Sequence, residues 1–123
     1  MDSKLETQKS KIETRPWGSF IILHDGENCK VKRLILSPKK RFSLQYHSKR
    51  TETWTIVKGK AKIRIGDNEK IYSYGETVTV PASAVHRAEN IGNEDVEIIE
   101  VQTGTYFGED DITRIEDDFG RIK

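Results

Sequence analysis

The chain has 123 residues, of which 34% are hydrophobic and 33% charged, and its 21 basic and 20 acidic residues leave a formal net charge of +1. This length predicts a single domain, and the near-neutral sum argues against a protein built mainly to coat DNA or RNA. No apolar run approaches the roughly 18 residues of a membrane span, and residues 1–14 contain no apolar signal-peptide stretch. The lone Cys29 forms no internal disulfide. We therefore expect a cytoplasmic protein with no membrane partner.

The first 14 residues are polar and charged, and Leu5 and Ile12 are their only large apolar residues after Met1. Such a segment is expected to be a frayed helix, a disordered arm or a linker. Order is expected to begin at the Arg-Pro-Trp-Gly turn of residues 15–18. The predicted organisation is therefore a polar arm, 1–14, followed by one domain, 15–123.

From residue 18 to residue 103 the chain reads as short strands separated by turn signals. Val, Ile, Thr and Tyr are frequent in the strands, and Gly, Pro, Asn and Asp mark the turns. Residues 60–65 alternate strictly between charged and apolar side chains. The predicted strands are 18–23, 29–36, 42–46, 53–58, 60–65, 69–73, 77–80, 85–90 and 96–103. Many short strands at even spacing predict a β-sandwich or β-barrel.

The composition changes after Gly104. Residues 109–118 open with three acidic residues, which favour a helix N-terminus. We therefore expect a short C-terminal helix over 109–118.

Four residues have the chemistry of a metal site. Gln45 and His47 are two apart, so they face the same way on an extended backbone. Glu52 shares the parity of Trp54 and is expected to point inward, where a carboxylate is costly unless it is paired or binds a metal. With His86 from a later strand, the set suits a divalent first-row ion with open coordination positions. Taken singly, a histidine in a β-domain is usually a surface or hydrogen-bonded residue.

The spacing of these residues resembles the two-part cupin signature. The first part is Gln45-x-His47, four residues, Glu52, six residues and Gly59; the second is Gly75, five residues, Pro81, four residues, His86, three residues and Asn90. Gln45 stands where many cupins have a first His, and Ser83 where many have Gly. The resemblance implies an all-β double-stranded β-helix, also called a jelly-roll barrel.

A narrower resemblance covers residues 15–121. The motifs at 43–47, 85–90, 99–106 and 108–114 are similar to those of the C-terminal isomerase domain of type II phosphomannose isomerases, the bifunctional mannose-6-phosphate isomerase/mannose-1-phosphate guanylyltransferases. That family carries Gln in place of the first cupin His. Two departures are visible: residues 48–51 lack the family's His-rich stretch, and Thr53 stands where a His is common. We expect no guanylyltransferase half in a chain of this length.

The family resemblance implies interconversion of mannose 6-phosphate and fructose 6-phosphate through an enediolate, with nucleotide-sugar supply as its purpose. It implies a divalent metal on Gln45, His47, Glu52 and His86, and leaves Zn, Mn, Co, Ni and Fe open. Glu52 is expected to be a metal ligand, and either it or a hydroxide on the metal to be the base.

Cationic side chains are needed for the phosphate. Arg114 is the first candidate for the phosphate or the enediolate; the alternative is an ion pair with Asp110, Asp111 or Asp117. Arg33, Lys32 and Arg87 are further candidates, and at most one of Lys32 and Arg33 faces the pocket because they are consecutive in one strand.

Other functions remain compatible with the same residues. The chain is either the isomerase, or a non-catalytic sugar-phosphate-binding module or partner of a separate guanylyltransferase, or, with less support from Gln45, an Fe(II) oxygenase. By analogy with other cupins we expect a homodimer.

Overall fold

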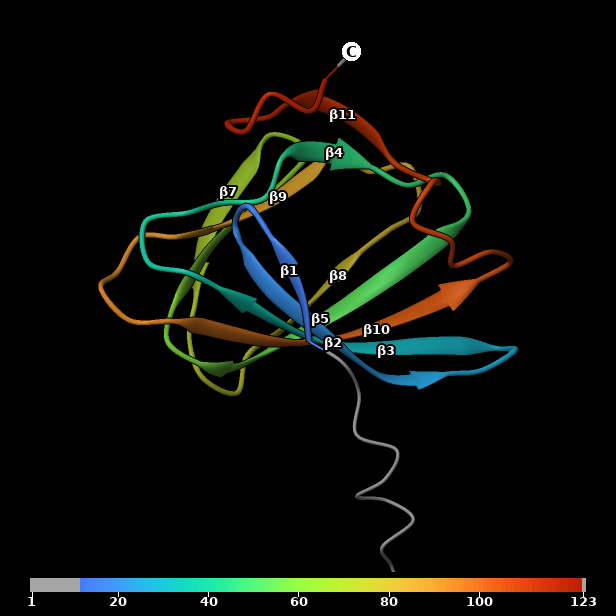
Figure 1. Ribbon diagram of the computed structural model, residues 1–123, viewed down its shortest axis with the longest axis horizontal. Helices are drawn as coiled ribbons and strands as arrows, with labels where there is room; N and C mark the ends of the chain where they lie inside the picture. The colour runs from blue at the N-terminus through green and yellow to red at the C-terminus, as the bar shows by residue number, and fades with distance from the viewer. Residues whose placement is uncertain (1–11, 123) are drawn as a thin grey trace, which may run out of the picture.

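The computed structural model describes residues 12–122, which form eleven strands in two antiparallel sheets. The six-stranded sheet has the order β1 (Ile12–Arg15), β2 (Gly18–Asp25), β3 (Cys29–Leu36), β10 (Val96–Gly104), β5 (Arg50–Lys58) and β8 (Thr77–Val80). The five-stranded sheet has the order β11 (Thr113–Glu116), β4 (Leu44–Tyr46), β9 (His86–Asn90), β6 (Ala61–Ile65) and β7 (Asn68–Tyr72). The sheets face each other and enclose the core (Figure 1). The expected all-β barrel is confirmed.

The N-terminal expectation needs one correction. Residues 12–15 form β1, which pairs with β2 and places Ile12 opposite Ile21. The regular structure therefore begins within the segment that was expected to be an arm, because a tight turn folds this segment back as a hairpin. The rest of the predicted arm lies outside the described residues.

The predicted C-terminal helix over 109–118 is wrong. Residues 113–116 form β11, which pairs with β4 and places Arg114 opposite Gln45. The acidic residues expected to open the helix instead have partners elsewhere in the fold: Glu109 pairs with Lys32, and Asp111 accepts the backbone N–H of Lys49 at 2.9 Å. Pairing with the open edge of β4 overrides the local preference for a helix.

The core lies between the two sheets and is built from inward-facing strand residues. Trp17 packs edge-on against Phe42 with ring centroids 4.5 Å apart, and Phe42 packs against Trp54 at 5.9 Å. Both tryptophans are buried, as the sequence predicts. Around them lie Phe20, Leu34, Leu36, Ile56, Ala61, Ile63, Val80, Ala88, Val96 and Ile98.

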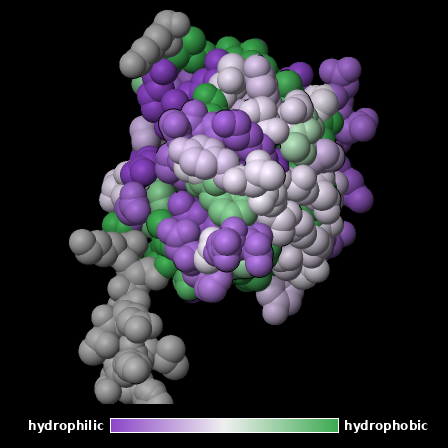
Figure 2. Space-filling view, turned by 90° about the vertical axis from the view of Figure 1, so that its right-hand side faces the viewer, coloured by the Kyte–Doolittle hydropathy of each residue, from purple (hydrophilic) through white to green (hydrophobic). Residues whose placement is uncertain are grey.

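On the face shown in Figure 2, hydrophilic residues are mixed with a broad area of intermediate hydropathy and with small separate apolar patches. This matches a chain that is one-third charged. Among residues 12–122 there is no helix that is long and apolar enough to cross a bilayer.

Candidate metal centre and its cavity

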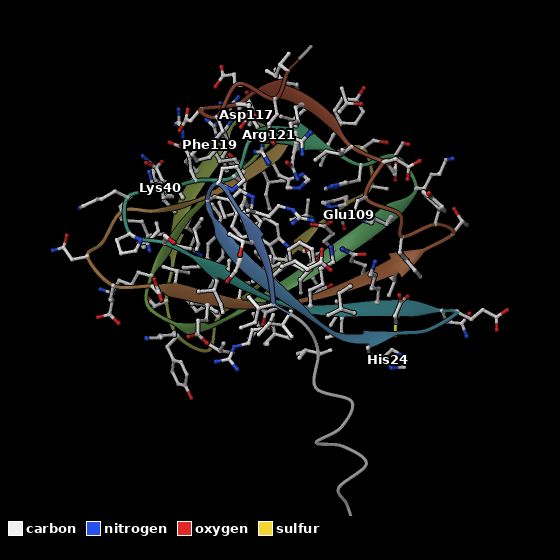
Figure 3. The ribbon with its side chains drawn as sticks, in the orientation of Figure 1. His24, Lys40, Glu109, Asp117, Phe119 and Arg121 are labelled. Carbon is white, nitrogen blue, oxygen red and sulfur yellow. The ribbon has the colours of Figure 1, made fainter. Side chains whose placement is uncertain are left out.

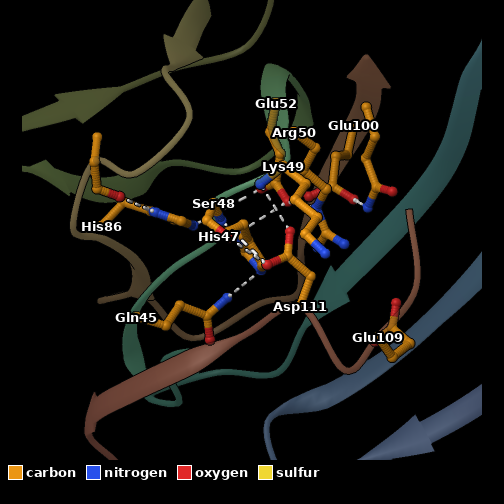
Figure 4. A network of polar contacts seen from close by, with 12 residues as sticks. Gln45, His47, Ser48, Lys49, Arg50, Glu52, His86, Glu100, Glu109 and Asp111 are labelled. Atoms are coloured by element: carbon orange, nitrogen blue, oxygen red, sulfur yellow. Dashed lines mark hydrogen bonds and ion pairs between the residues drawn. The ribbon is translucent and has the colours of Figure 1, made fainter. Parts of the chain in front are cut away.

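Strands from both sheets bring the predicted metal ligands together. β4 carries Gln45, which lies directly opposite His86 of β9, while β5 carries Glu52. His47 follows β4 at the start of the turn into β5. One ligand atom each from His47, Glu52 and His86 lie within 4.8 Å of one another, and all three residues are buried (Figure 4). His47 and Glu52 are close in the chain, whereas His86 comes from a later strand and meets them because the sheets close into a barrel.

The His86 ring has a defined tautomer. Its Nδ1 lies 2.9 Å from the backbone oxygen of Ala84. Because a carbonyl oxygen can only accept, Nδ1 carries the proton and Nε2 presents a lone pair. Nε2 is buried, has no hydrogen-bond partner in the described part of the chain, and lies 3.8 Å from Glu52 Oε1. A buried, unpartnered imidazole nitrogen facing a carboxylate is what a metal ligand requires.

The second imidazole is also held neutral. His47 Nδ1 lies 3.4 Å from Glu52 Oε2. Burial, followed by the nearby Arg50 guanidinium, lowers the pKa of His47 to about 3. Burial is also the main cause that lowers the pKa of His86. Neutral rings can bind a metal without first losing a proton.

Glu52 is a buried carboxylate in an unusual electrostatic setting. Its Oε2 accepts a hydrogen bond of 2.8 Å from Arg50 Nε. Burial and the neighbouring Glu100 raise its pKa well above the ordinary value, and Arg50 acts in the opposite direction. Glu52 is therefore a buried carboxylate with a second buried carboxylate beside it, and a divalent cation between Glu52 and the two histidines would stabilise its charged form.

Gln45 lies beside this group with its amide nitrogen toward His47 and its amide oxygen toward Ser43. Its Nε2 is 3.4 Å from His47 Nε2, and its Oε1 accepts a hydrogen bond from Ser43 Oγ. A glutamine ligand must present its oxygen. The structure thus places Gln45 next to the predicted site, and its role as a ligand stays a prediction.

A cavity of about 80 Å³ adjoins the candidate metal centre. It lies inside the polar end of the barrel, and Trp54, Phe20 and Leu34 form part of its apolar wall. Its polar lining consists of Arg15, Lys32, Gln45, His47, Arg50, Glu52, Glu100, Glu109, Arg114 and Arg121. The cavity therefore combines metal-binding side chains with several cations, as a phosphorylated ligand would need.

Arg114 is a cation of this cavity that has no acidic partner among residues 12–122. Its Nε is buried without a hydrogen bond. Burial, followed by repulsion from Arg121, lowers its pKa. Within residues 12–122, none of the three acids considered as its partner pairs with it: Asp110 accepts from Tyr106, Asp111 from Ser48 and Lys49, and Asp117 from Arg121. A guanidinium in this state is suited to an anion from outside.

The other cationic candidates are divided by strand parity. Lys32 is buried and lines the cavity, whereas Arg33 is exposed and pairs with Glu97 on the outer face. The expectation that at most one of them faces inward is confirmed. Arg87 points away from the cavity, donates to the Phe42 carbonyl at 3.1 Å and lies 3.3 Å from Glu116. The structure therefore separates Arg33 and Arg87 from the other predicted site residues.

Sequence reasoning missed several residues of the cavity. Arg50 and Glu100 could have been found by strand parity, because Arg50 precedes Glu52 by two positions and Glu100 follows Ile98 by two. The acidic residue Glu109 was expected to open a helix and instead lines the cavity. Arg15 and Arg121 reach it from the two ends of the described chain, a closeness that spacing does not reveal.

Residues 2–117 match the family described as "Mannose-6-phosphate isomerase C-terminal". The chain is 41% identical over 116 residues to the alginate biosynthesis protein AlgA of Pseudomonas aeruginosa, covering 94% of this chain and 24% of the relative. It is 40% identical over 122 residues to a mannose-1-phosphate guanylyltransferase of Salmonella muenchen, covering 99% and 26% respectively. The chain thus spans about a quarter of the length of these curated relatives.

Solved structures support the fold. A conserved protein from Klebsiella pneumoniae with a double-stranded β-helix domain superposes with a TM-score of 0.69 at 19% identity, covering 79% of this chain and 83% of that one. At this identity the likeness concerns the fold alone. It confirms the expected double-stranded β-helix, or cupin, architecture.

Proposed function

This chain belongs to the family of mannose-6-phosphate isomerase C-terminal domains, and from that membership we propose that it is a metal-dependent isomerase that interconverts mannose 6-phosphate and fructose 6-phosphate. One observation carries the proposal beyond the family: the unpartnered Nε2 of His86 lies next to Glu52, beside a cavity that also contains the unpartnered Arg114. A metal-binding group and a free guanidinium in one cavity suit a sugar phosphate.

His47, Glu52 and His86 would hold a divalent first-row ion, with Gln45 as the fourth ligand once its amide oxygen faces the other three. When bound, such an ion polarises the sugar carbonyl and stabilises the enediolate. The hydrogen bond from His86 Nδ1 to the Ala84 carbonyl fixes the orientation of the ring, so the ring needs little reorganisation to bind the ion.

The substrate phosphate would be bound by Arg114 and Lys32. Both line the cavity, and Lys32 is only 3% exposed, so the interaction with a phosphate would be weakly screened. Arg114 can present two N–H groups to a phosphate, whereas Lys32 acts as a compact charge.

Glu52 is better suited to be a ligand than a base. Arg50 occupies Oε2, and Oε1 faces His86 Nε2. With a metal ion between Oε1 and His86 Nε2, both oxygens would be engaged before any substrate proton is removed. Its role as the base would require a break in one of these contacts, and stays a prediction.

The biological setting follows from the relatives' names. They are tied to alginate biosynthesis, xanthan biosynthesis and mannose-1-phosphate guanylylation. We therefore propose that the chain works in carbohydrate biosynthesis. Its expected homodimer and its cytoplasmic location stay predictions.

A coupled assay on mannose 6-phosphate tests the isomerase. The protein is stripped of metal and reloaded separately with Mn, Co, Zn or Ni. His86→Ala removes a proposed ligand, and His24→Ala is the matched control because His24 is exposed outside the cavity. Turnover that requires metal, is lost in His86→Ala and persists in His24→Ala is the expected result.

Two results would contradict the proposal. Turnover in metal-free protein would show that the reaction does not need a metal. A protein that is folded, metal-loaded and able to bind mannose 6-phosphate, but gives no turnover with any metal, would instead be a sugar-phosphate-binding module.

A further inference from the structure

The cavity is too small for the substrate that the proposed function requires. Its volume is about 80 Å³, against roughly 300–1,000 Å³ for typical small-molecule sites. A sugar phosphate fits entirely inside this space only if part of the lining moves. The lining residue that can leave at the lowest cost is one that is partly exposed and carried on a segment without regular structure.

Glu109 meets both conditions. It lies on the segment between β10 and β11, and its side chain is 53% exposed. Figure 3 shows it on this segment, on the side toward the barrel interior. Its carboxylate Oε2 accepts a hydrogen bond from Lys32 Nζ. Glu109 therefore closes the cavity at the position of one of its cations.

Lys32 is the less mobile partner of this pair. Its side chain is 4% exposed, and its ammonium lies 4.3 Å from the centre of the Phe20 ring. A buried ammonium needs an anion or a polar group beside it. Within residues 12–122 its one ion pair is with Glu109.

Several cations act on the Glu109 carboxylate at once. Burial works to raise its pKa, but Lys32, and then Arg50, hold the pKa below its ordinary value. Glu109 also raises the pKa of Arg114, so its charge reaches the other proposed phosphate ligand. The carboxylate thus lies where the positive charges of the cavity converge.

We propose that the Glu109 carboxylate occupies the phosphate position of this cavity, and that a phosphorylated ligand binds by displacing it from Lys32. This inference rests on the proposed function for the identity of the sugar, and on the Glu109–Lys32 contact for the exchange itself. Glu109 is thereby a specificity-determining residue, and no reaction step is assigned to it.

The exchange explains why the cavity would select phosphorylated ligands. A phosphate dianion replaces the carboxylate and leaves Lys32 with an anionic partner. A neutral sugar that displaced Glu109 would leave the buried ammonium unpaired, which is costly. The Glu109 carboxylate therefore lowers the affinity for neutral sugars more than the affinity for sugar phosphates.

The test is the affinity of the full, metal-loaded chain for inorganic phosphate, measured by calorimetry. Glu109→Gln keeps the shape of the side chain and removes the competing charge, so we expect the Kd to fall by about threefold to tenfold. Lys32→Met should weaken phosphate binding, and in the Lys32→Met background Glu109→Gln should give no further gain. The thermal midpoint of each variant checks that it is folded.

The matched control uses the pair on the opposite face of the same strand. Glu97→Gln removes the same charge from the Arg33 pair, which lies outside the cavity, and should leave the Kd unchanged. An equal gain in Glu97→Gln, or a gain from Glu109→Gln that persists without Lys32, would show a general charge effect and overturn the inference. Weaker phosphate binding in Glu109→Gln, or an unchanged Kd, would also overturn it.

A second arm compares mannose with mannose 6-phosphate. Glu109→Gln should reduce the preference for the phosphorylated sugar, because mannose no longer has to displace a paired carboxylate. An unchanged preference would contradict the specificity role. All these readouts are binding constants, so the exchange can be confirmed in a protein that fails the isomerase assay, and the two failures are distinguishable.

Discussion

The two ends of the barrel interior are built from the same three strands and have opposite chemistry. Toward one end, Leu34 of β3 lies opposite Ile98 of β10, which lies opposite Ile56 of β5. Toward the other end, Lys30 lies opposite Gln102, which lies opposite Glu52. All of these side chains are buried. The inward-facing residues change from apolar to polar at Lys32 on β3 and at Glu100 on β10, and β5 has Trp54 at that level and Glu52 one step further.

This comparison shows how a small barrel can hold charges in its interior. The apolar end supplies the burial that stabilises the fold. The charged end opposes folding unless each group has a partner, so its residues are joined in a network: Trp54 Nε1 donates to Glu100 at 3.0 Å, and Gln102 donates to Glu100 at 2.7 Å. Trp54 lies at the boundary and belongs to both ends. Substitutions at the apolar end should therefore change stability, and those at the charged end should change binding.

The largest expected effect on stability is at the apolar end. Ile98 is fully buried, and Ile98→Ala should lower the free energy of unfolding by about 3 kcal/mol, since it removes apolar contacts and leaves a cavity. Urea unfolding measures this change. Ile71→Ala is the control, because Ile71 is 48% exposed and should change stability by less than about 0.5 kcal/mol. Equal losses in the two variants would contradict the division of the interior.

The charged end should gain its stability from a metal. At a free metal concentration of 100 times Kd, binding should add about 2.7 kcal/mol to the free energy of unfolding. A thermal scan with and without the ion should show this as a raised midpoint. His86→Ala should lose the increase, whereas Ile98→Ala should keep it from a lower starting point. A thermal midpoint that no divalent ion raises would contradict a metal site at this end of the barrel.

The two ends also differ in how well the sequence predicts them. The apolar end follows from alternation, and so does the inward direction of Glu52, Trp54 and Ile56, because strand parity fixes the face on which a side chain lies. Parity also separates Lys32 from Arg33. These features depend on neighbours in the chain.

The features that sequence reasoning missed depend on distant partners. The acidic residues from 109 onward were expected to open a helix because their local sequence favours one, and the preference lost to pairing of Arg114 opposite Gln45. Glu109 and Lys32 are 77 residues apart, so their contact has no local signature. The candidate metal ligands were singled out by a spacing that resembles a known signature, whereas the contact of Glu109 with the cavity required the structure.

A third prediction concerns the C-terminal segment that covers the charged end. Asp117 accepts hydrogen bonds of 2.7 and 2.8 Å from Arg121, and these contacts lower its pKa to about 2. Because the folded pKa lies below the ordinary 3.8, this stabilisation is present above about pH 4 and is lost as the pH falls toward 2. Asp117→Asn should cost about 1.5 kcal/mol at pH 7.

The free energy of unfolding, measured at a series of acidic pH values, provides the check. The difference in unfolding free energy between the parent and Asp117→Asn should shrink as the pH falls from 4 to 2, the window set by the pKa of about 2 for Asp117. A difference that stays constant across this range would mean that the charge of Asp117 is not what stabilises the segment.

The smallest expected effect is at the turn beside the candidate metal centre. The Asp111 carboxylate accepts hydrogen bonds from Ser48 Oγ at 2.9 Å and from the backbone N–H of Lys49 at 2.9 Å, and so ties the segment that carries Glu109 to the turn after His47. Asp111→Asn weakens these contacts without changing the side-chain size. Since the site is partly exposed, the loss of stability should be about 1 kcal/mol or less.

The same substitution should act more clearly on binding. A looser segment lets Glu109 leave Lys32 at lower cost, so Asp111→Asn should tighten phosphate binding in the same direction as Glu109→Gln but by less. Asp110→Asn is the control, because Asp110 accepts from Tyr106 within the same segment and makes no contact with the turn after His47 in the described structure. If Asp111→Asn instead weakens phosphate binding, the segment orders the phosphate ligands more than it competes with the phosphate, and the charged end is closer to its binding geometry than the small cavity indicates.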